Sequence, residues 1–169
     1  MRFVDPSHPI LSQVAEEIRP EDIGTPRIQD FIDRMLGVAG VERGNPNKAV
    51  LVGLAAPQIG LPVRIILVDT GANGKGGIST IRVYINPKII HASEDEVEWY
   101  EACFSTGSVA GIVSRPRVIT VEALNENGDK VVETYTDYVA RIFQHEIDHL
   151  NGRRFPVLIK DVSKLHLVE

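Results

Sequence analysis

The spacing of apolar residues predicts an amphipathic helix over residues 26–41. Five apolar side chains recur there at intervals of three and four positions and would share one helix face: Ile28, Phe31, Ile32, Met35 and Leu36. Thr25 precedes them as an N-cap, and Pro26 occupies the first helical position, where its fixed backbone angle fits. The stretch at 43–48 that follows is rich in Gly, Asn and Pro, which predicts a surface loop.

The middle of the chain has the composition of β-strands. Residues 63–69 and 81–85 are β-branched runs joined by a glycine-rich stretch at 71–77, which predicts two strands and a flexible loop. Asn86-Pro87 is expected to end or bulge the second strand. Residues 117–124 and 130–136 match each other across Asn125-Glu126-Asn127-Gly128-Asp129, which predicts a β-hairpin.

A second helix is predicted over residues 138–150. Thr136 or Asp137 would cap it, and Asn151-Gly152 would end it, because glycine suits a left-handed C-terminal turn. The order helix, strands, helix is an α+β pattern and not the regular alternation of a doubly wound sheet. One buried helix packed on antiparallel strands fits this order.

Composition narrows the class of protein. A chain of 169 residues is long enough for one core and short for two, so we expect a single domain over 1–169. The net charge of −5, with both signs scattered, argues against a DNA-binding surface. No apolar run approaches the roughly 20 residues of a spanning helix, and the N-terminus lacks a secretory pattern, so we expect a cytoplasmic protein without membrane partners. Cys103 is the single cysteine, which excludes an internal disulfide.

The second helix carries the sequence His145-Glu146-Ile147-Asp148-His149. Histidines four positions apart lie one turn apart on one face, so both imidazoles can reach one metal ion. A glutamate beside them is the signature of a carboxylate that handles the protons of water at a metal. This motif predicts a metal-dependent hydrolase with Glu146 as the general acid/base. Solvated histidines on a surface helix, or histidines hydrogen-bonded in the core, are the alternative.

A catalytic metal usually takes three protein ligands. The candidates for the third are His91, His166, several carboxylates and Cys103. We favour Cys103, because it lies among small and apolar residues in Glu101-Ala102-Cys103-Phe104-Ser105 and a thiolate binds borderline or soft divalent ions strongly. The alternative for this residue is a buried, inert cysteine. Glu101 is expected either to orient the site or to form an ordinary salt bridge.

Small residues mark a third segment, Gly53-Leu54-Ala55-Ala56-Pro57-Gln58. They allow a ligand or a second backbone to approach closely. Gln58 is the one side chain here with hydrogen-bonding capacity, and its amide could donate to the oxygen of a carbonyl under attack. Close packing of a strand on a helix is the alternative interpretation.

These three segments occur in the order and approximate spacing of the peptide deformylases, and the chain resembles that family from Asp5-Pro6 through Gly152. The resemblance implies antiparallel sheets around a central helix that carries the histidines. It implies removal of the formyl group from the N-terminal methionine of newly synthesised proteins, in a bacterial-type cytoplasm or an organelle of bacterial descent. N-formyl-methionyl nascent polypeptides would be the substrates.

The resemblance also implies roles for individual residues. The metal ligands would be Cys103, His145 and His149, holding Fe²⁺, with Zn²⁺, Ni²⁺ or Co²⁺ as substitutes. Glu146 would be the acid/base, and Gln58 and the backbone N–H of Phe104 would hydrogen-bond the formyl oxygen. The backbone that pairs with an extended substrate would belong to Val52, Gly53 and Ala102.

Three positions depart from the family pattern: Leu51 and Ala102 replace glycines, and Phe104 replaces leucine. The changes at Ala102 and Phe104 leave the ligand and the backbone groups available but narrow the cleft. Phe104 and Arg141 are expected to line the methionine pocket.

Other functions fit parts of the pattern. A zinc peptidase of another kind would share the helix motif, and a deformylase-like hydrolase could act on another small N-acyl group. A non-enzymatic module with a structural metal would not need both Glu146 and Gln58. The basic residues of the C-terminal segment suggest transient ribosome contact or merely a solvated face: Arg153, Arg154, Lys160 and Lys164.

Overall fold

The computed structural model describes residues 3–41, 51–76 and 80–168. It contains two α-helices, α1 (Pro26–Val38) and α2 (Asp137–Leu150). The strands are β1 (Gly53–Ala55), β2 (Ile65–Asp69), β3 (Ile81–Ala92), β4 (Glu96–Ala102), β5 (Val109–Pro116), β6 (Val118–Leu124), β7 (Lys130–Thr136) and β8 (Leu165–Leu167). Short 3-10 helices, among them η4 (Ala56–Ile59) and η5 (Phe104–Thr106), follow two of the strands.

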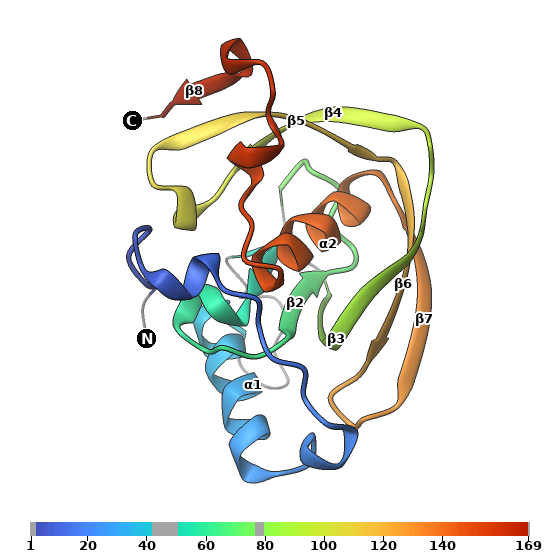
Figure 1. The fold of residues 1–169 in the computed structure, drawn as a ribbon. Helices are drawn as coiled ribbons and strands as arrows, with labels where there is room; N and C mark the ends of the chain where they lie inside the picture. Colours follow the sequence, from blue (N-terminus) through green and yellow to red (C-terminus); the bar gives the residue numbers. More distant parts are fainter. Residues whose placement is uncertain (1–2, 42–50, 77–79, 169) are drawn as a thin grey trace.

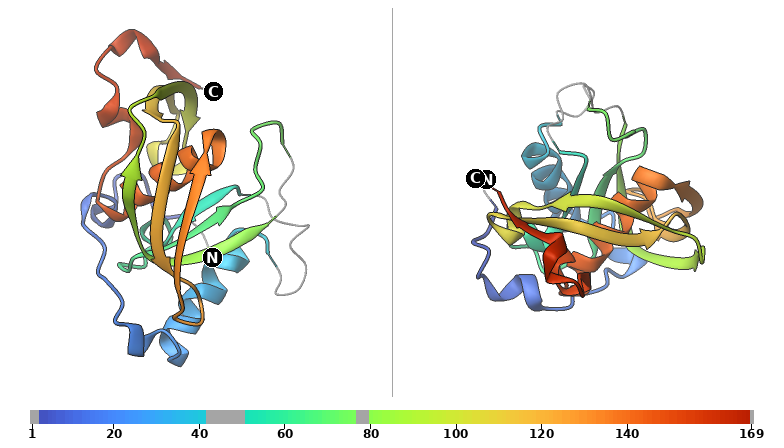
Figure 2. Two further views of the ribbon diagram at one scale, coloured as in Figure 1. Left: turned by 90° about the vertical axis from the view of Figure 1, so that its right-hand side faces the viewer. Right: turned by 90° about the horizontal axis from the view of Figure 1, so that it is seen from above.

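The strands form two sheets, and strands of both lie around the helix α2. One sheet has the order β1-β2-β3-β6-β7 and the other has β4-β5-β8, and neighbouring strands are antiparallel throughout. Figure 1 shows α2 in the middle of the molecule, with strands of both sheets around it, and Figure 2 shows the same arrangement from two other sides. The α+β fold with antiparallel sheets around a C-terminal helix is therefore confirmed.

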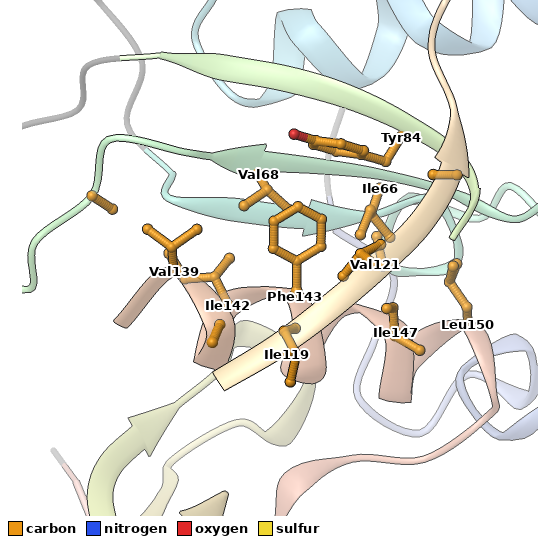
Figure 3. Close-up of a cluster of buried hydrophobic side chains, with 14 of the residues drawn as sticks. Ile66, Val68, Tyr84, Ile119, Val121, Val139, Ile142, Phe143, Ile147 and Leu150 are labelled. Atoms are coloured by element: carbon orange, nitrogen blue, oxygen red, sulfur yellow. The ribbon is translucent and has the colours of Figure 1, made fainter. Parts of the chain in front are cut away.

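The apolar face of α2 packs on the five-stranded sheet. Phe143 is fully buried there and lies edge-on to Tyr84, with 4.8 Å between ring centroids; both residues are labelled in Figure 3. Phe143 also stacks on Tyr135, with 4.6 Å between ring centroids. Ile66 and Val68 of β2 belong to the same cluster. Because the apolar face of α2 is buried in this core, packing fixes the position of α2 on the five-stranded sheet.

The other face of the same sheet is covered by α1. Alternate residues of β2, Ile65 and Leu67, belong to a second cluster with Ile32 and Met35 of α1. Side chains of a strand alternate between faces, so β2 is buried on both sides and contains no polar residue before its last position, Asp69.

The local expectations were mostly confirmed. The predicted hairpin corresponds to β6 and β7, and Gly152 is left-handed with φ +68°, as its place after α2 predicted. Asn86 has φ +51° at an interruption in the pairing of β3 with β6, so Asn86-Pro87 bulges the strand without ending it. Thr25 and Thr136 occupy the N-cap positions of α1 and α2 but make no side-chain capping hydrogen bond.

The predicted end of the first helix was wrong. It ends at Val38 instead of residue 41, because Gly40 turns left-handed with φ +76°. Its N–H donates to Gly37 and the N–H of Val41 donates to Leu36, the pair of bonds that closes a Schellman motif. The predicted loop at 43–48 lies outside the described residues, as does the last residue of the glycine-rich stretch at 71–77.

Four strands were not predicted from the sequence: β1, β4, β5 and β8. β1 and β8 have three residues each, and β4 carries three glutamates, Glu96, Glu98 and Glu101. In the part of the chain that the structure describes, no helix is long and apolar enough to cross a membrane.

Candidate active site

Helix α2 and the end of β4 bring three metal-binding side chains together. His145 and His149 lie one turn apart on α2, with ring centroids 5.0 Å apart. Cys103 directly follows β4, and its Sγ lies 3.3 Å from Nε2 of His149. The three ligand atoms lie within 4.8 Å of one another, close enough to bind one ion.

Among the described residues this is the one group of three His, Cys or acidic side chains with that geometry. The two other histidines considered from the sequence do not reach it. His91 lies in β3 opposite Thr120, and His166 lies in β8, stacked against Tyr100. The preference for Cys103 as the third member of the group therefore agrees with the geometry.

The donor set fits a divalent metal ion. One sulfur and two imidazole nitrogens suit borderline and soft ions. The same neighbourhood also holds buried polar atoms without a hydrogen-bond partner in the described residues, Oε2 of Glu146 and Nδ1 of His149. Unpartnered buried polar atoms are costly, so Oε2 of Glu146 is expected to face a bound water or substrate.

A buried carboxylate orients His145. Oε2 of Glu101 lies 2.8 Å from Nδ1 of His145, while its Oε1 accepts from Nε of Arg115 at 2.6 Å and from Nη1 of Arg141 at 2.6 Å. Burial raises the pKa of the Glu101 carboxyl, but hydrogen bonds from His145 and Arg115 outweigh it and hold the pKa well below its usual range. An ionised carboxylate only accepts, so the proton lies on Nδ1 and Nε2 is free to bind a metal.

This geometry combines both expectations for Glu101. The residue orients a member of the metal-binding group, and it also forms a salt bridge with arginines. Arg115 extends the network, because its Nη1 donates to Asp148 at 2.8 Å, and Asp148 also accepts from Arg153 at 2.9 Å.

Glu146 follows His145 of the metal-binding group on α2. Its side chain is buried, and burial raises the pKa of its carboxyl to about 7. A Cβ on Gly53 would lie 2.5 Å from Oε1 of Glu146, so only glycine leaves room for this carboxylate beside β1. A carboxyl with a pKa near neutrality can both take and return a proton at physiological pH.

Gln58, a residue of η4, lies next to Cys103 of the metal-binding group. Its Oε1 accepts from the backbone N–H of Ala55 at 2.8 Å, which fixes the orientation of the amide. Nε2 therefore points at Sγ of Cys103, 3.4 Å away, and at Oγ of Ser105, 3.2 Å away. Phe104 begins η5 between these two residues, and its side chain is exposed and stacked on Phe3.

A cleft of about 300 Å³ opens over these groups. Its walls include the terminal strands of the two sheets, since among the described residues β1 pairs only with β2 and β4 only with β5. All the residues expected to contact substrate line it: Val52, Gly53, Gln58, Ala102, Phe104 and Arg141. Two unpaired strand edges facing a cleft can receive an extended chain between them.

The structure adds detail to the expectation for Arg141. Arg141 lines the cleft, but its guanidinium is buried and donates to Glu101 and to the backbone oxygens of Val97 and Val113. Its hydrogen-bonding capacity is directed into the protein, so the part left for a ligand is mainly its apolar stem.

Sequence reasoning missed several contributing residues. Arg115 had a faint signal, a single cation near the end of the apolar strand β5. Phe3 had none, because nothing in the sequence places the N-terminal segment beside η5. Ser105 and Tyr138 lay in or next to motifs already recognised, but nothing pointed to their contacts with Gln58 and with the cleft.

Comparison with known proteins agrees with this geometry. A family model described as polypeptide deformylase matches residues 1–164. The peptide deformylase of Pseudothermotoga lettingae is 36% identical over 152 residues, which cover 89% of this chain and 78% of that protein. The class I type b peptide deformylase from Acinetobacter baumannii superposes with a TM-score of 0.81 at 28% identity, covering 94% of this chain and 98% of that one.

A second structure of the Acinetobacter baumannii enzyme, with Met-Ala-Ser bound, superposes with a TM-score of 0.80 at 28% identity over 94% of this chain and 98% of that one. These likenesses do not favour the alternative of a hydrolase for another small acyl group. The chain therefore belongs to the polypeptide deformylase family, hydrolases that use one metal ion to remove the formyl group from the N-terminal methionine of newly synthesised proteins.

Proposed function

We propose that Cys103, His145 and His149 hold the metal ion and that Glu146 is the general acid/base of deformylation. The observation that carries this proposal is the convergence of three ligand atoms within 4.8 Å beside a buried carboxylate with an unpartnered oxygen. We infer Fe²⁺ as the ion in the cell, with Zn²⁺, Ni²⁺ and Co²⁺ as substitutes, since a site of one thiolate and two imidazoles accepts several ions.

Glu146 moves the protons. It takes one from the water that attacks the formyl carbon, and it delivers one to the nitrogen of methionine as the carbon–nitrogen bond breaks, giving formate and a free amine. A pKa near neutrality suits both steps. A divalent ion, when bound, supplies Lewis-acid chemistry, lowering the pKa of water and polarising a carbonyl. Glu101 keeps the His145 ring in the orientation this requires.

The oxygen of the formyl group gains negative charge during attack. We propose that Nε2 of Gln58 and the backbone N–H of Phe104 donate to it. The amide of Gln58 is already fixed by its bond to Ala55, so it needs no reorientation during the reaction. Ser105, which also contacts Nε2, helps to hold this donor in place.

The substrate is proposed to lie as an extended strand between β1 and β4. Backbone groups of Val52, Gly53 and Ala102 on these two edges would pair with it, which recognises main chain and leaves most side chains loosely specified. The methionine side chain would enter the inner end of the cleft, over Ile142, Tyr138 and the stem of Arg141. A bound Met-Ala-Ser in the Acinetobacter baumannii enzyme supports this substrate class.

We propose that residues 1–169 act as one catalytic domain, because both sheets contribute to the cleft. We also propose that the protein works in the cytoplasm. Contact with the ribosome through the C-terminal basic residues is proposed to be transient. Arg153 pairs with Asp148, Arg154 donates to backbone oxygens of Pro6 and Ser105, and Lys164 pairs with Glu98. These three cations are engaged within the chain, so only part of the basic segment is left for RNA.

The proposed function is tested with protein purified without oxygen and loaded with one equivalent of Fe²⁺ or Ni²⁺. Formyl-Met-Ala-Ser should release formate, whereas acetyl-Met-Ala-Ser and unblocked Met-Ala-Ser should remain intact. Cleavage of the unblocked peptide would identify a peptidase of another kind. Stoichiometric metal without hydrolysis of any peptide would favour a structural site.

Glu146→Ala should bind metal like the wild type, but its kcat should fall by about 100- to 10,000-fold, the usual contribution of a positioned acid/base. The reason is that Glu146 handles protons without being a ligand. Elemental analysis checks that the variant still binds metal, and turnover of formyl-Met-Ala-Ser measures the loss of kcat. Turnover near the wild-type rate would remove Glu146 from the mechanism.

Gly53→Ala should reduce kcat/KM by on the order of 100-fold, because the added methyl would displace the Glu146 carboxylate. Gly37→Ala is the matched control, since a Cβ there meets no atom within 4 Å. The measurement is steady-state kinetics with metal content held equal. Similar kinetics for the two variants would show that close packing at Gly53 does not position Glu146.

A further inference from the structure

We propose that a hollow bordered by Arg64, Lys88 and Asn151 binds the phosphate group of a small organic phosphate ester. These three side chains would donate hydrogen bonds to the phosphate oxygens, and apolar residues beside them would contact the organic part. The inference goes beyond deformylation, because none of the three residues lines the active-site cleft.

The hollow and the active-site cleft lie on different faces of α2. The hollow has a volume of about 510 Å³ and shares no lining residue with the cleft. Gln144 and Asn151 of α2 and its C-cap line the hollow, whereas Ile142 and Glu146 line the cleft. Two positions along an α-helix turn a side chain by about 200° around the axis, so Gln144 points away from both of these cleft residues.

Positive charge is concentrated in this hollow, although the chain as a whole has a net charge of −5. Four cationic side chains line it, Arg64, Lys88, Arg115 and Arg153, against one carboxylate, that of Asp148. Arg115 and Arg153 both donate to Asp148, at 2.8 and 2.9 Å. The charges of Arg64 and Lys88 are therefore left without a carboxylate partner among the lining residues, and the hollow attracts anions.

Arg64 is the buried cation without a close counterion. Its side chain belongs to a residue that is 8% exposed, and its Nη1 donates to the backbone oxygen of Leu150 at 3.2 Å and to Oδ1 of Asn151 at 3.0 Å. Within the described residues, its Nε is buried without a hydrogen-bond partner. Glu17 attracts Arg64 from a distance, but its ion pair is with Lys88. A buried charge and a buried donor without partners are costly, and an anion beside the guanidinium offsets that cost.

Asn151 and Lys88 supply two further donors. Oδ1 of Asn151 accepts from Arg64, so the amide is oriented and its Nδ2 is left to donate elsewhere. Nζ of Lys88 lies 3.1 Å from the carboxylate of Glu17, but both side chains are more than half exposed, at 57% and 60%. An exposed ion pair of this kind contributes little free energy, so the ammonium can turn to a phosphate.

The arrangement of the donors favours phosphate over carboxylate. Arg64 directly precedes β2, Lys88 belongs to β3, and Asn151 is the C-cap of α2, so the donors approach from three elements of the fold. The oxygens of a phosphate point in tetrahedral directions and can accept from all three, whereas the two oxygens of a carboxylate lie in one plane.

The size of the hollow and its apolar residues favour an organic ester over free phosphate. Its volume lies within the roughly 300–1,000 Å³ of small-molecule sites, which is more than one phosphate group fills. Pro87, Ile89 and Leu158 belong to its lining, and Ile89 and Leu158 are 37% and 36% exposed. The organic part of a ligand would cover this apolar surface.

The test is isothermal titration calorimetry with the full-length, zinc-loaded protein, with AMP as the phosphate ester. AMP should bind with a Kd of about 1 mM or below, and inorganic phosphate should bind about three- to tenfold more weakly because it lacks the apolar contacts. Adenosine and acetate should give no binding heat, because adenosine lacks the anion and acetate lacks the tetrahedral oxygens.

Arg64→Met should weaken AMP binding by about 10- to 100-fold, the usual effect of losing a hydrogen bond from a charged group, and Lys88→Met by about three- to tenfold. Lys130→Met is the matched control for Lys88. Lys130 is also an exposed strand lysine paired with a glutamate, Glu122 at 2.7 Å, but it lies outside the hollow, so its replacement should leave the affinity within twofold of the wild type. If Arg64→Met unfolds, as judged by circular dichroism, the comparison of Lys88→Met with Lys130→Met decides.

The inference is overturned if AMP does not bind, or if it binds folded Lys88→Met and Arg64→Met as tightly as the wild type, which would place the phosphate on the metal ion. Acetate or adenosine binding as tightly as AMP would also overturn it. Failure of the proposed function looks different: Lys88→Met should hydrolyse formyl-Met-Ala-Ser at the wild-type rate, and an inactive wild type would leave the calorimetric result unchanged.

Discussion

The buried carboxylate of Glu101 is the group on which the rest of the site depends. It joins β4 to β5 through Arg115 and joins both to α2 through Arg141 and His145. Burying a charge is costly unless it is paired and fully hydrogen-bonded, and here the donors hold the pKa of the carboxyl low enough to keep it ionised. Since Cys103 lies two residues beyond Glu101, the same contacts that fix the small sheet on α2 also bring the thiol to the two histidines.

A second constraint is the separation of the two sheets. β1 ends one sheet and β4 ends the other, and within the described part of the chain neither has a second neighbouring strand, so two unpaired edges flank the cleft beside α2. Gly53 on one edge leaves room for Glu146, and Ala102 lies at the end of the other edge. A substrate strand added between these edges is thus proposed to lie beside the acid/base and the metal-binding group.

The sequence predicted the parts that depend on local spacing. Neighbouring positions in the sequence were enough to predict three features: the histidines one turn apart, the hairpin around Gly128, and the small residues before Gln58. Cys103 was chosen because a catalytic metal needs a third ligand. Contacts between distant segments could not be read in this way. Arg115 contacts both Glu101 and Asp148, and Phe3 stacks on Phe104. These contacts depend on how the two sheets and the N-terminal segment pack. The end of α1 was missed because apolar periodicity continues into Val41, although Gly40 already reverses the chain.

X-ray absorption spectroscopy of the zinc-loaded protein tests the central claim, that one thiolate from the end of β4 and two imidazoles from α2 hold the ion. We expect one sulfur scatterer at about 2.3 Å and two imidazole nitrogens at about 2.0–2.1 Å, with the remaining position filled by a light atom. A coordination shell of nitrogen and oxygen alone, at full metal occupancy, would contradict the role of Cys103 and with it the joining of the end of β4 to α2 at the metal.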